Sequence, residues 1–445
     1  MSQTRAARRG GRVISAIRHN AFAAAVAAVA LLVMGWLGLY GWAWTDWDAE
    51  ARPAVDALLA GHVSQFLTLA PVYGGSLILR APFAFLTKLW HGHELAIYRA
   101  SAAPCLAASG VLGVWLVARM RAAGASTLAR AVALMLCIAN PLTLSALEIG
   151  HPEELLGAVL CVAAVLCAMH DRPTWAAVLL GLAIPNKEWA VLAVGPMLVA
   201  LQRGRVRALV ITGAVASVLL APFMLAPTLT SASSSGAASA AASAVNTGAI
   251  FQPWQIWWFL GSHGHVVRGL NGNIKPGFRT PPGWIESVGH PLIVAIMVPL
   301  TGLYAGLRRR RAGRLPNAPL LLLALLLALR CVLDPWDISY YSLPFLLTLL
   351  AWETLSFNRA PVLSLLAALA ASVIFQQVPD LPIVLSPDMA ALVFALVSVP
   401  SIIALSLALY LPGVGRLLRS RPRRDTVTAA TGWLHTSTQN AGAGT

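Results

Sequence analysis

Charge is scarce in this chain. Charged residues make up 11% of its 445 positions, and only 17 residues are acidic. Apolar residues make up 58% and the mean hydropathy is +0.72, whereas soluble domains hold roughly 45–50% apolar residues. A chain so poor in charge does not cover a water-exposed surface, so the composition excludes an ordinary soluble globular domain.

Cysteine is also sparse, and its pattern excludes a thiolate metal centre. The five cysteines all lie in apolar runs, and none has the spacing of a metal-binding pair. In such surroundings cysteine is a small packing residue. We interpret all five in this way: Cys105, Cys137, Cys161, Cys167 and Cys331.

Long stretches without charge are abundant, and they predict an all-α polytopic membrane protein. A bilayer core of roughly 30 Å is crossed by about 20 apolar residues in a helix. The first run follows five arginines and exceeds the roughly 7–15 apolar residues of a cleaved signal, so we interpret it as a retained span. The predicted spans are 21–44, 99–118, 129–147, 155–169, 174–185, 189–202, 208–226, 291–307, 317–333, 341–356, 360–376 and 389–411.

The placement of lysine and arginine orients these spans, because cytoplasmic loops hold the excess of both. With the N-terminus in the cytoplasm, 23 of the 32 basic residues fall on the cytoplasmic side and 9 on the other. Of the 17 acidic residues, 3 fall on the cytoplasmic side and 14 outside. The sequence therefore predicts cytoplasmic termini and acidic extracytoplasmic loops.

The segment Gly74–Trp90 is apolar enough to suggest another span, yet it contains Arg80 and Lys88. A charge at the centre of a membrane helix costs about 2.5–3.5 kcal/mol on insertion scales. A crossing here would also move every later arginine cluster outside. We therefore expect an amphipathic helix along the outer membrane interface.

These observations predict one membrane module, at 21–411, between a basic cytoplasmic N-terminus (1–20) and a basic cytoplasmic tail (412–445) that we expect to be disordered. Two large extracytoplasmic loops are expected, at 45–98 and 227–290. The net charge of +15 is mostly the cytoplasmic arginine excess. It requires no nucleic-acid partner, and the tail is suited to anionic lipid head groups.

Polar residues gather in several of the predicted outer loops. The first follows the first span at once, with Asp46 and Asp48 among tryptophans. Three more clusters are "EIGHPEE" (148–154), "NKEW" (186–189) and "RCVLDPWDISYY" (330–341). Ionisable groups at membrane depth are expensive, so their presence on one face suggests a shared polar cavity.

The order of these segments resembles that of the GT-C glycosyltransferases, over most of residues 40–345. In that superfamily an acidic motif opens the first outer loop, and a helix of the form acid-x-L-x-x-G follows ten residues on. Here Asp46 stands ten residues before "DALLAG" (56–61), and a Tyr/Pro segment leads into the expected interfacial helix. The second span is led by an arginine, Arg99.

Downstream, "GHPEELL", "GLAIPNKEWA" and "DPWDISYY" are similar to segments of the bacterial polyprenyl-phosphate-mannose branch. The family's second acid would directly follow Asp46, but Trp47 stands there and Asp48 comes next. Both aspartates therefore remain candidates for the catalytic base. We expect the membrane module alone, without a large soluble C-terminal domain.

The resemblance implies a bundle of about 12 transmembrane helices in the bacterial plasma membrane. It implies transfer of a hexose, with mannose favoured, from polyprenyl phosphate to a glycolipid or cell-envelope glycan, with inversion. The acceptor hydroxyl needs a base, and the departing phosphate needs positive charge. Asp46 or Asp48 is the expected base, and Lys187 and Arg330 are the expected phosphate-binding residues. Sugar or acceptor contacts are expected from His151, Glu153, Glu154, Trp189, Asp334, Trp336, Asp337 and Tyr341.

The carboxylates allow Mg²⁺ or Mn²⁺ without requiring either, and no metal ligand is assigned. Two other functions stay open. A lipid-linked sugar flippase or secondary transporter is expected to show inverted repeats and mid-membrane charges, whereas this chain shows no internal repeat. A non-catalytic assembly protein would not need the polar clusters.

Overall fold

The computed structural model describes residues 21–36, 46–229, 253–262, 267–268, 274–275, 279, 282–310, 317–375 and 386–411. The predicted basic ends 1–20 and 412–445 and much of the predicted loop 227–290 lie outside the described residues. The described chain is helical apart from its turns and one antiparallel pair of two-residue strands, β1 (Val267–Arg268) and β2 (Ile274–Lys275). The all-α class predicted from the sequence is confirmed.

Six helical stretches among the described residues are long and apolar enough to cross a membrane. They are α5 (Glu94–Ala122), α6 with α7 (Thr127–Ile138 and Pro141–Ile149), α8 (Pro152–Met169), α11 (Arg205–Leu229), α13 (Gly283–Arg310) and α17 (Pro387–Tyr410). By length and composition these helices indicate a multi-pass membrane protein.

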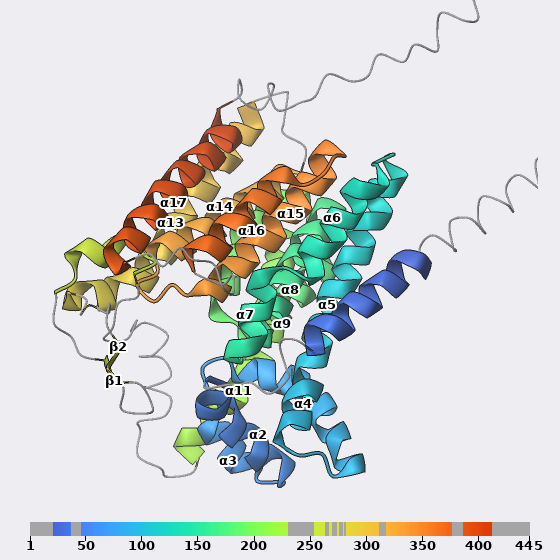
Figure 1. Ribbon diagram of the computed structural model, residues 1–445, viewed down its shortest axis with the longest axis vertical. Coiled ribbons are helices and arrows are strands. Elements are labelled where there is room, and N and C mark those ends of the chain that lie inside the picture. The colour runs from blue at the N-terminus through green and yellow to red at the C-terminus, as the bar shows by residue number, and fades with distance from the viewer. Residues whose placement is uncertain are drawn as a thin grey trace, which may run out of the picture.

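Shorter helices complete the bundle and run beside the long ones (Figure 1). They are the N-terminal helix Ala21–Trp36, α9 (Pro173–Asn186), η3 and α10 (Glu188–Ala193 and Val194–Ala200), α14 (Ala318–Leu333), η5 and α15 (Ser339–Ser342 and Leu343–Phe357) and α16 (Val362–Ile374). Within the described residues, every span predicted from the sequence falls on a helical segment, although the ends differ by several residues. Positions 37–44 of the first predicted span and position 376 of the span 360–376 lie outside the described residues.

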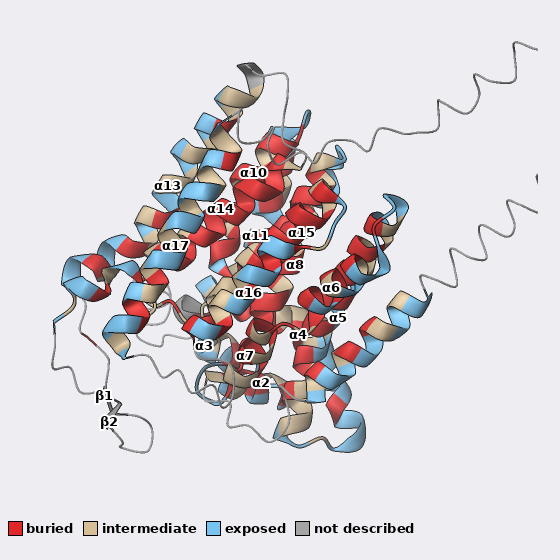
Figure 2. Cartoon of the chain, turned by 45° about the horizontal axis from the view of Figure 1, so that its top comes forward, coloured by how far each residue is buried: buried red, intermediate tan, exposed pale blue. Residues whose placement is uncertain are grey.

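The share of buried residues distinguishes a central helix of the bundle from helices at its periphery. In the most apolar 18-residue window of α8, 72% of the residues are buried, whereas the corresponding share is 11% in α17 and 17% in both α11 and α13. Figure 2 shows the same contrast, with α8, α14 and α15 mostly red and α17 and α13 mostly pale blue and tan. Apolar side chains on the outer helices are thus free to face lipid.

The first loop, predicted at 45–98, folds into short helices that cover one end of the bundle. They are η1 (Trp47–Ala51), α2 (Arg52–Leu59), α3 (Val63–Leu69), α4 (Gly74–Leu86) and η2 (Thr87–Trp90). The predicted amphipathic helix is α4 with η2, and its exposed apolar residues include Leu89 and Trp90. Arg80, however, is only 1% exposed and lies inside the protein.

Three breaks between helices shape this end of the bundle. Asn140 caps α7 by accepting a hydrogen bond from the Thr143 N–H at 2.9 Å. Gly150 ends α7 with a φ of 107°, and a Cβ there would lie 2.6 Å from the Trp47 nitrogen. Pro185 stands near the C-terminus of α9, directly before Asn186 and the extended Lys187. The breaks bring the first turn of α8 close to the start of η1 and bring Lys187, directly after α9, to that same turn.

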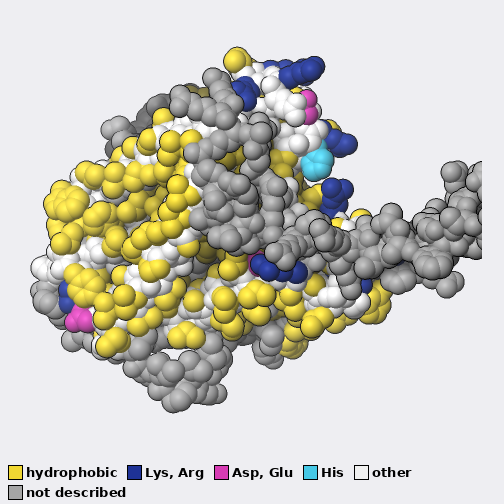
Figure 3. Space-filling model, turned by 90° about the horizontal axis from the view of Figure 1, so that it is seen from above, with side chains coloured by type: hydrophobic (Ala, Val, Ile, Leu, Met, Phe, Trp, Pro, Cys, Tyr) yellow, Lys and Arg dark blue, Asp and Glu magenta, His cyan; other side chains and the backbone are white. Residues whose placement is uncertain are grey.

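The opposite end of the bundle, here called the basic end, carries the turn between α5 and α6 and the turn between α15 and α16. Asn358 links the two turns by donating a hydrogen bond to the Ala123 carbonyl. The buried Glu353 side chain accepts hydrogen bonds from the Leu363 and Ser364 N–H groups, both at 2.9 Å, at the start of α16. Viewed from this end, Lys and Arg side chains gather along one side (Figure 3).

Candidate functional site

A cluster of ionisable side chains lies where η1, the α7–α8 break, the end of α9 and the end of α14 meet, at the end opposite the basic end. Its central residues are Asp46, His151, Glu153, Glu154 and Lys187. These residues come from three of the polar sequence clusters. Their predicted proximity is therefore borne out by the geometry, although the role of each remains a prediction.

His151 occupies the middle of the cluster and is 3% exposed. Its Nδ1 lies 2.6 Å from Glu153 Oε1, and its Nε2 lies 3.2 Å from Asp46 Oδ2. The ring also packs against Tyr340 and Tyr73, with centroids 4.7 and 5.7 Å away. The imidazole is thus held in one orientation between two carboxylates.

Burial and the charge of Lys187 act to lower the pKa of His151, but the charge of Glu153 and the hydrogen bonds with Asp46 and Glu153 outweigh them and raise the pKa to about 9. At neutral pH His151 is therefore an imidazolium, and both ring nitrogens donate hydrogen bonds. One donates to Asp46 and the other to Glu153.

Glu153 is fully buried and is surrounded by cations. Lys187 Nζ lies 3.4 Å from its Oε1, and Arg80 NH2 lies 3.3 Å from its Oε2. The same lysine lies 3.4 Å from Glu154 Oε1 and 4.1 Å from the ring centroid of Tyr73. Burial acts to lower the pKa of Lys187, yet Glu154 and Glu153 raise it to about 12, so the amine stays charged.

Arg330 lies at the C-terminal end of α14 between two aromatic rings. Its guanidinium carbon is 4.2 Å from the Tyr341 ring centroid and 5.3 Å from that of Trp189. Its NH1 donates to the Tyr341 carbonyl at 3.3 Å. Trp189 in turn donates from Nε1 to Glu154 Oε2 at 2.9 Å. Trp189, predicted to contact sugar, is thus buried and supports Arg330.

Arg330 differs from Lys187 in its ionic surroundings. Within the described part of the chain, no carboxylate lies within ion-pair distance of Arg330, whereas Lys187 has two. Asp334, an obvious partner by sequence, instead lies 3.4 Å from His290 Nε2 and accepts a 3.0 Å hydrogen bond from the Trp336 N–H. Of these two cations, Arg330 is therefore the one without a direct carboxylate partner among the described residues.

The two candidate bases lie in different environments. The Asp46 side chain is 34% exposed and bonds to His151. The Asp48 side chain is 47% exposed and pairs with Arg52 at 3.2 Å, in a surface group that also contains Asp56 and Glu94. Asp46 is thus joined to the buried cluster, and Asp48 to a solvated ion network.

Asp337 and Trp336 lie beside the cluster. Asp337 is fully buried, and burial together with the charge of Asp334 raises its pKa well above the usual range. Neither of its side-chain oxygens has a hydrogen-bond partner within normal distance and angle limits among the described residues. Trp336 is half-buried. A neutral Asp337 acid is a hydrogen-bond donor.

Sequence reasoning missed Arg80 and two tyrosines as members of the site. From the sequence, the charge of Arg80 predicted an interfacial helix. In the structure the Arg80 guanidinium pairs with Glu153. Tyr73 donates to Glu50 Oε2 at 2.6 Å, and Tyr340 packs on His151. An arginine in an apolar helix beside a glutamate-bearing loop was the available signal for Arg80.

The carboxylates of the cluster are paired with basic side chains of the protein and are not arranged around a divalent metal ion. No group of three or more His, Cys, Asp or Glu side chains in the described ranges is arranged to hold a metal ion. Glu153 is already compensated by Lys187, Arg80 and His151. Mg²⁺ and Mn²⁺, which the sequence allowed, therefore have no obvious set of oxygen ligands here.

Comparisons of the chain with models of protein families, with curated proteins and with solved structures find no match.

Proposed function

We propose that this chain is an integral-membrane glycosyltransferase of the GT-C type. It would transfer a hexose, with mannose favoured, from a polyprenyl-phosphate donor to a glycolipid or cell-envelope glycan on the extracytoplasmic face of the bacterial plasma membrane. The observation that carries the proposal is the convergence, at one end of the bundle, of a reachable carboxylate (Asp46) and a cation without an ion-pair partner among the described residues (Arg330).

The proposed reaction is a single displacement. An acceptor hydroxyl oxygen attacks the anomeric carbon, the bond from that carbon to the phosphate oxygen breaks, and polyprenyl phosphate leaves with the bonding electrons. Asp46 takes the hydroxyl proton, and its partial exposure leaves a path for the acceptor. The His151 imidazolium holds the Asp46 carboxylate in place.

Arg330 is the proposed partner of the leaving phosphate. Guanidinium binds phosphate through two parallel hydrogen bonds, and the aromatic rings of Tyr341 and Trp189 hold it rigidly in a low-dielectric site. Lys187, bound to Glu153 and Glu154, contributes by fixing these carboxylates and adds a second positive charge nearby.

The experiment uses purified protein, a synthetic short-chain polyprenyl-phosphate mannose and candidate glycolipid acceptors. We expect a new glycosidic bond, and we expect Asp46→Asn to slow transfer by about 10²–10⁴-fold, the usual contribution of a general base. Asp48→Asn is the matched control, because it removes a neighbouring aspartate that pairs with Arg52 outside the cluster, and it should leave the rate unchanged.

Other outcomes assign other functions. Equal rates for Asp46→Asn and wild type would refute the base assignment. Movement of lipid-linked sugar across vesicles without a new glycosidic bond would support the flippase or transporter hypothesis. If all substitutions in the cluster left cells unaffected, the assembly-protein hypothesis would be favoured.

A further inference from the structure

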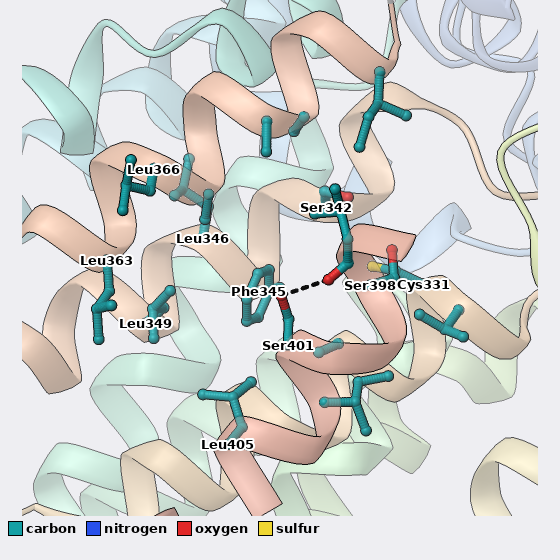
Figure 4. A pocket seen from close by; sticks show the side chains of 18 of the residues that line it. Cys331, Ser342, Phe345, Leu346, Leu349, Leu363, Leu366, Ser398, Ser401 and Leu405 are labelled. Atoms are coloured by element: carbon teal, nitrogen blue, oxygen red, sulfur yellow. Dashed lines mark hydrogen bonds between the residues drawn. The ribbon is translucent and has the colours of Figure 1, made fainter. Parts of the chain in front are cut away.

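A long apolar groove lies between α15, α16 and α17, with one wall from α14 (Figure 4). Its volume is about 520 Å³, within the roughly 300–1,000 Å³ range of pockets that bind organic ligands. Nearly all of its lining side chains are apolar, and only a few serines interrupt them. Such a lining has no use for a polar ligand and suits a hydrocarbon chain.

The groove opens on the outer surface of the bundle. Leu363, Leu366 and Val397 line it and are nevertheless 40%, 57% and 38% exposed. They belong to α16 and α17, which are apolar helices on the periphery of the bundle. A chain dissolved in the bilayer can therefore enter sideways, without crossing water.

The other end of the groove reaches the candidate site. Cys331 and Ser342 line the groove, and Cys331 Sγ lies 3.2 Å from the Tyr341 carbonyl oxygen. Arg330 NH1 lies 3.3 Å from that same oxygen. The end of the apolar groove and the guanidinium proposed for phosphate thus meet at a single backbone carbonyl.

The wall formed by α16 and α17 favours a branched chain over a straight one. Its small lining residues stand among larger ones such as Leu366 and Phe394, so the wall is uneven along its length; the small residues are Ala367, Ala370, Ala371, Ser398 and Ser401. Small side chains widen a groove and leave room for methyl groups along its length, whereas a straight acyl chain would leave such space unfilled, and unfilled space forfeits packing contacts.

We propose that this groove holds the isoprenoid chain of the polyprenyl-phosphate donor, with its phosphate against Arg330. The proposal rests on the function proposed above. It assigns α15, α16 and α17 to recognition of the lipid and leaves the sugar and acceptor to the opposite side of Arg330.

The test compares a groove-filling variant with a matched control on the same helix. Ala371→Phe places a ring in the groove, whereas Val373→Phe adds the same ring at a position of α16 that is exposed and does not line it. Transfer is measured with donors of two and of about ten isoprene units. We expect Ala371→Phe to lower kcat/KM for the long donor about tenfold, through KM, and to leave the short donor unchanged. If, in each variant, kcat/KM for the long donor changes by the same factor as kcat/KM for the short donor, the groove assignment is wrong.

A second measurement separates this proposal from the proposed function. A polyprenyl phosphate that carries a diazirine on its chain and no sugar is photolysed with the wild-type protein in vesicles, and labelled peptides are mapped by mass spectrometry. Labelling within α16 and α17 that excess phosphatidylglycerol does not displace supports the groove even if no transfer is detected. Labelling elsewhere, or displacement by phosphatidylglycerol, overturns it.

Discussion

At the scale of single residues, His151 makes the stability of the protein depend on pH. Its pKa is about 9 in the folded chain and 6.5 as an ordinary histidine. Because the folded-state pKa is the higher one, the stabilisation is fully present below about pH 6.5 and is lost as pH rises through 9. The effect is on the order of 3 kcal/mol.

We therefore predict that wild type melts at a higher temperature than His151→Gln at pH 6, and that this advantage largely disappears at pH 9.5. Thermal unfolding in detergent at both values measures it. Other groups also titrate in this range, so the difference between the two proteins is the informative quantity. A difference that is constant with pH would show that folding does not raise the pKa of His151.

Arg80 and Arg52 form a contrasting pair of arginines. Arg80 pairs with Glu153 in the interior, whereas Arg52 pairs with Asp48 and is 32% exposed. Removing one member of a buried pair costs about 3–5 kcal/mol, because the remaining charge stays buried. An exposed pair contributes about 0–1 kcal/mol.

Arg80→Met should therefore lower the melting temperature markedly, and Arg52→Met should hardly change it. Differential scanning fluorimetry in detergent distinguishes the two. Similar losses for both variants would mean that water reaches Arg80. Lys187 and His151 also compensate Glu153, which places the expected loss at the lower end of the range.

At the scale of helices, Gly150 fixes how α7, α8 and η1 fit together. Its φ of 107° is rare for a residue with a side chain, and a Cβ would meet the Trp47 backbone. We expect Gly150→Ala to destabilise the protein by about 1–3 kcal/mol. It should also impair the site, since Trp47 follows Asp46.

Gly213 supplies the control for this substitution. It lies within α11 and a Cβ there would meet nothing within 4 Å. Gly213→Ala should leave stability unchanged or raise it by about 0.4–1 kcal/mol, because alanine restricts the unfolded chain. Chemical denaturation of both variants gives the comparison, and a neutral Gly150→Ala would contradict the predicted clash.

Helix positions were the most predictable part of the fold. Apolar runs located the helical segments of the bundle in the part of the chain that the structure describes, because a stretch without charge has few other stable conformations in lipid. The ends were less predictable. For example, α5 begins at Glu94 and not at 99, since solvated polar turns extend a helix beyond its apolar part.

The sequence predicted which residues gather at the candidate site better than it predicted which of them form ion pairs and hydrogen bonds. Residues of three polar clusters meet, as their shared face suggested, but the burial of Arg80 and the pairing of Asp334 with His290 were not foreseen. Such pairings join residues far apart in sequence. They depend on how α4 and α13 lie against the bundle, which periodicity and composition do not specify.

At the scale of the whole molecule, the candidate site and the basic end lie at opposite ends of the bundle. If the site is extracytoplasmic, a cysteine at Ser64, in α3, should react with a membrane-impermeant maleimide in intact cells. A cysteine at Ala123, in the α5–α6 turn, should react only after the membrane is opened. Both positions are exposed. The reverse pattern would show that the topology is opposite to the predicted one and would contradict the proposed function.

The ion pairs between α8 and α9 bear on how the chain is made. Glu153, Glu154 and Lys187 would each be costly to place in a bilayer alone, but they lie on two consecutive helices and pair with each other. The hairpin thus carries part of its own charge compensation as it leaves the ribosome. It can enter the membrane as a unit, long before α14 is synthesised and Arg330 arrives.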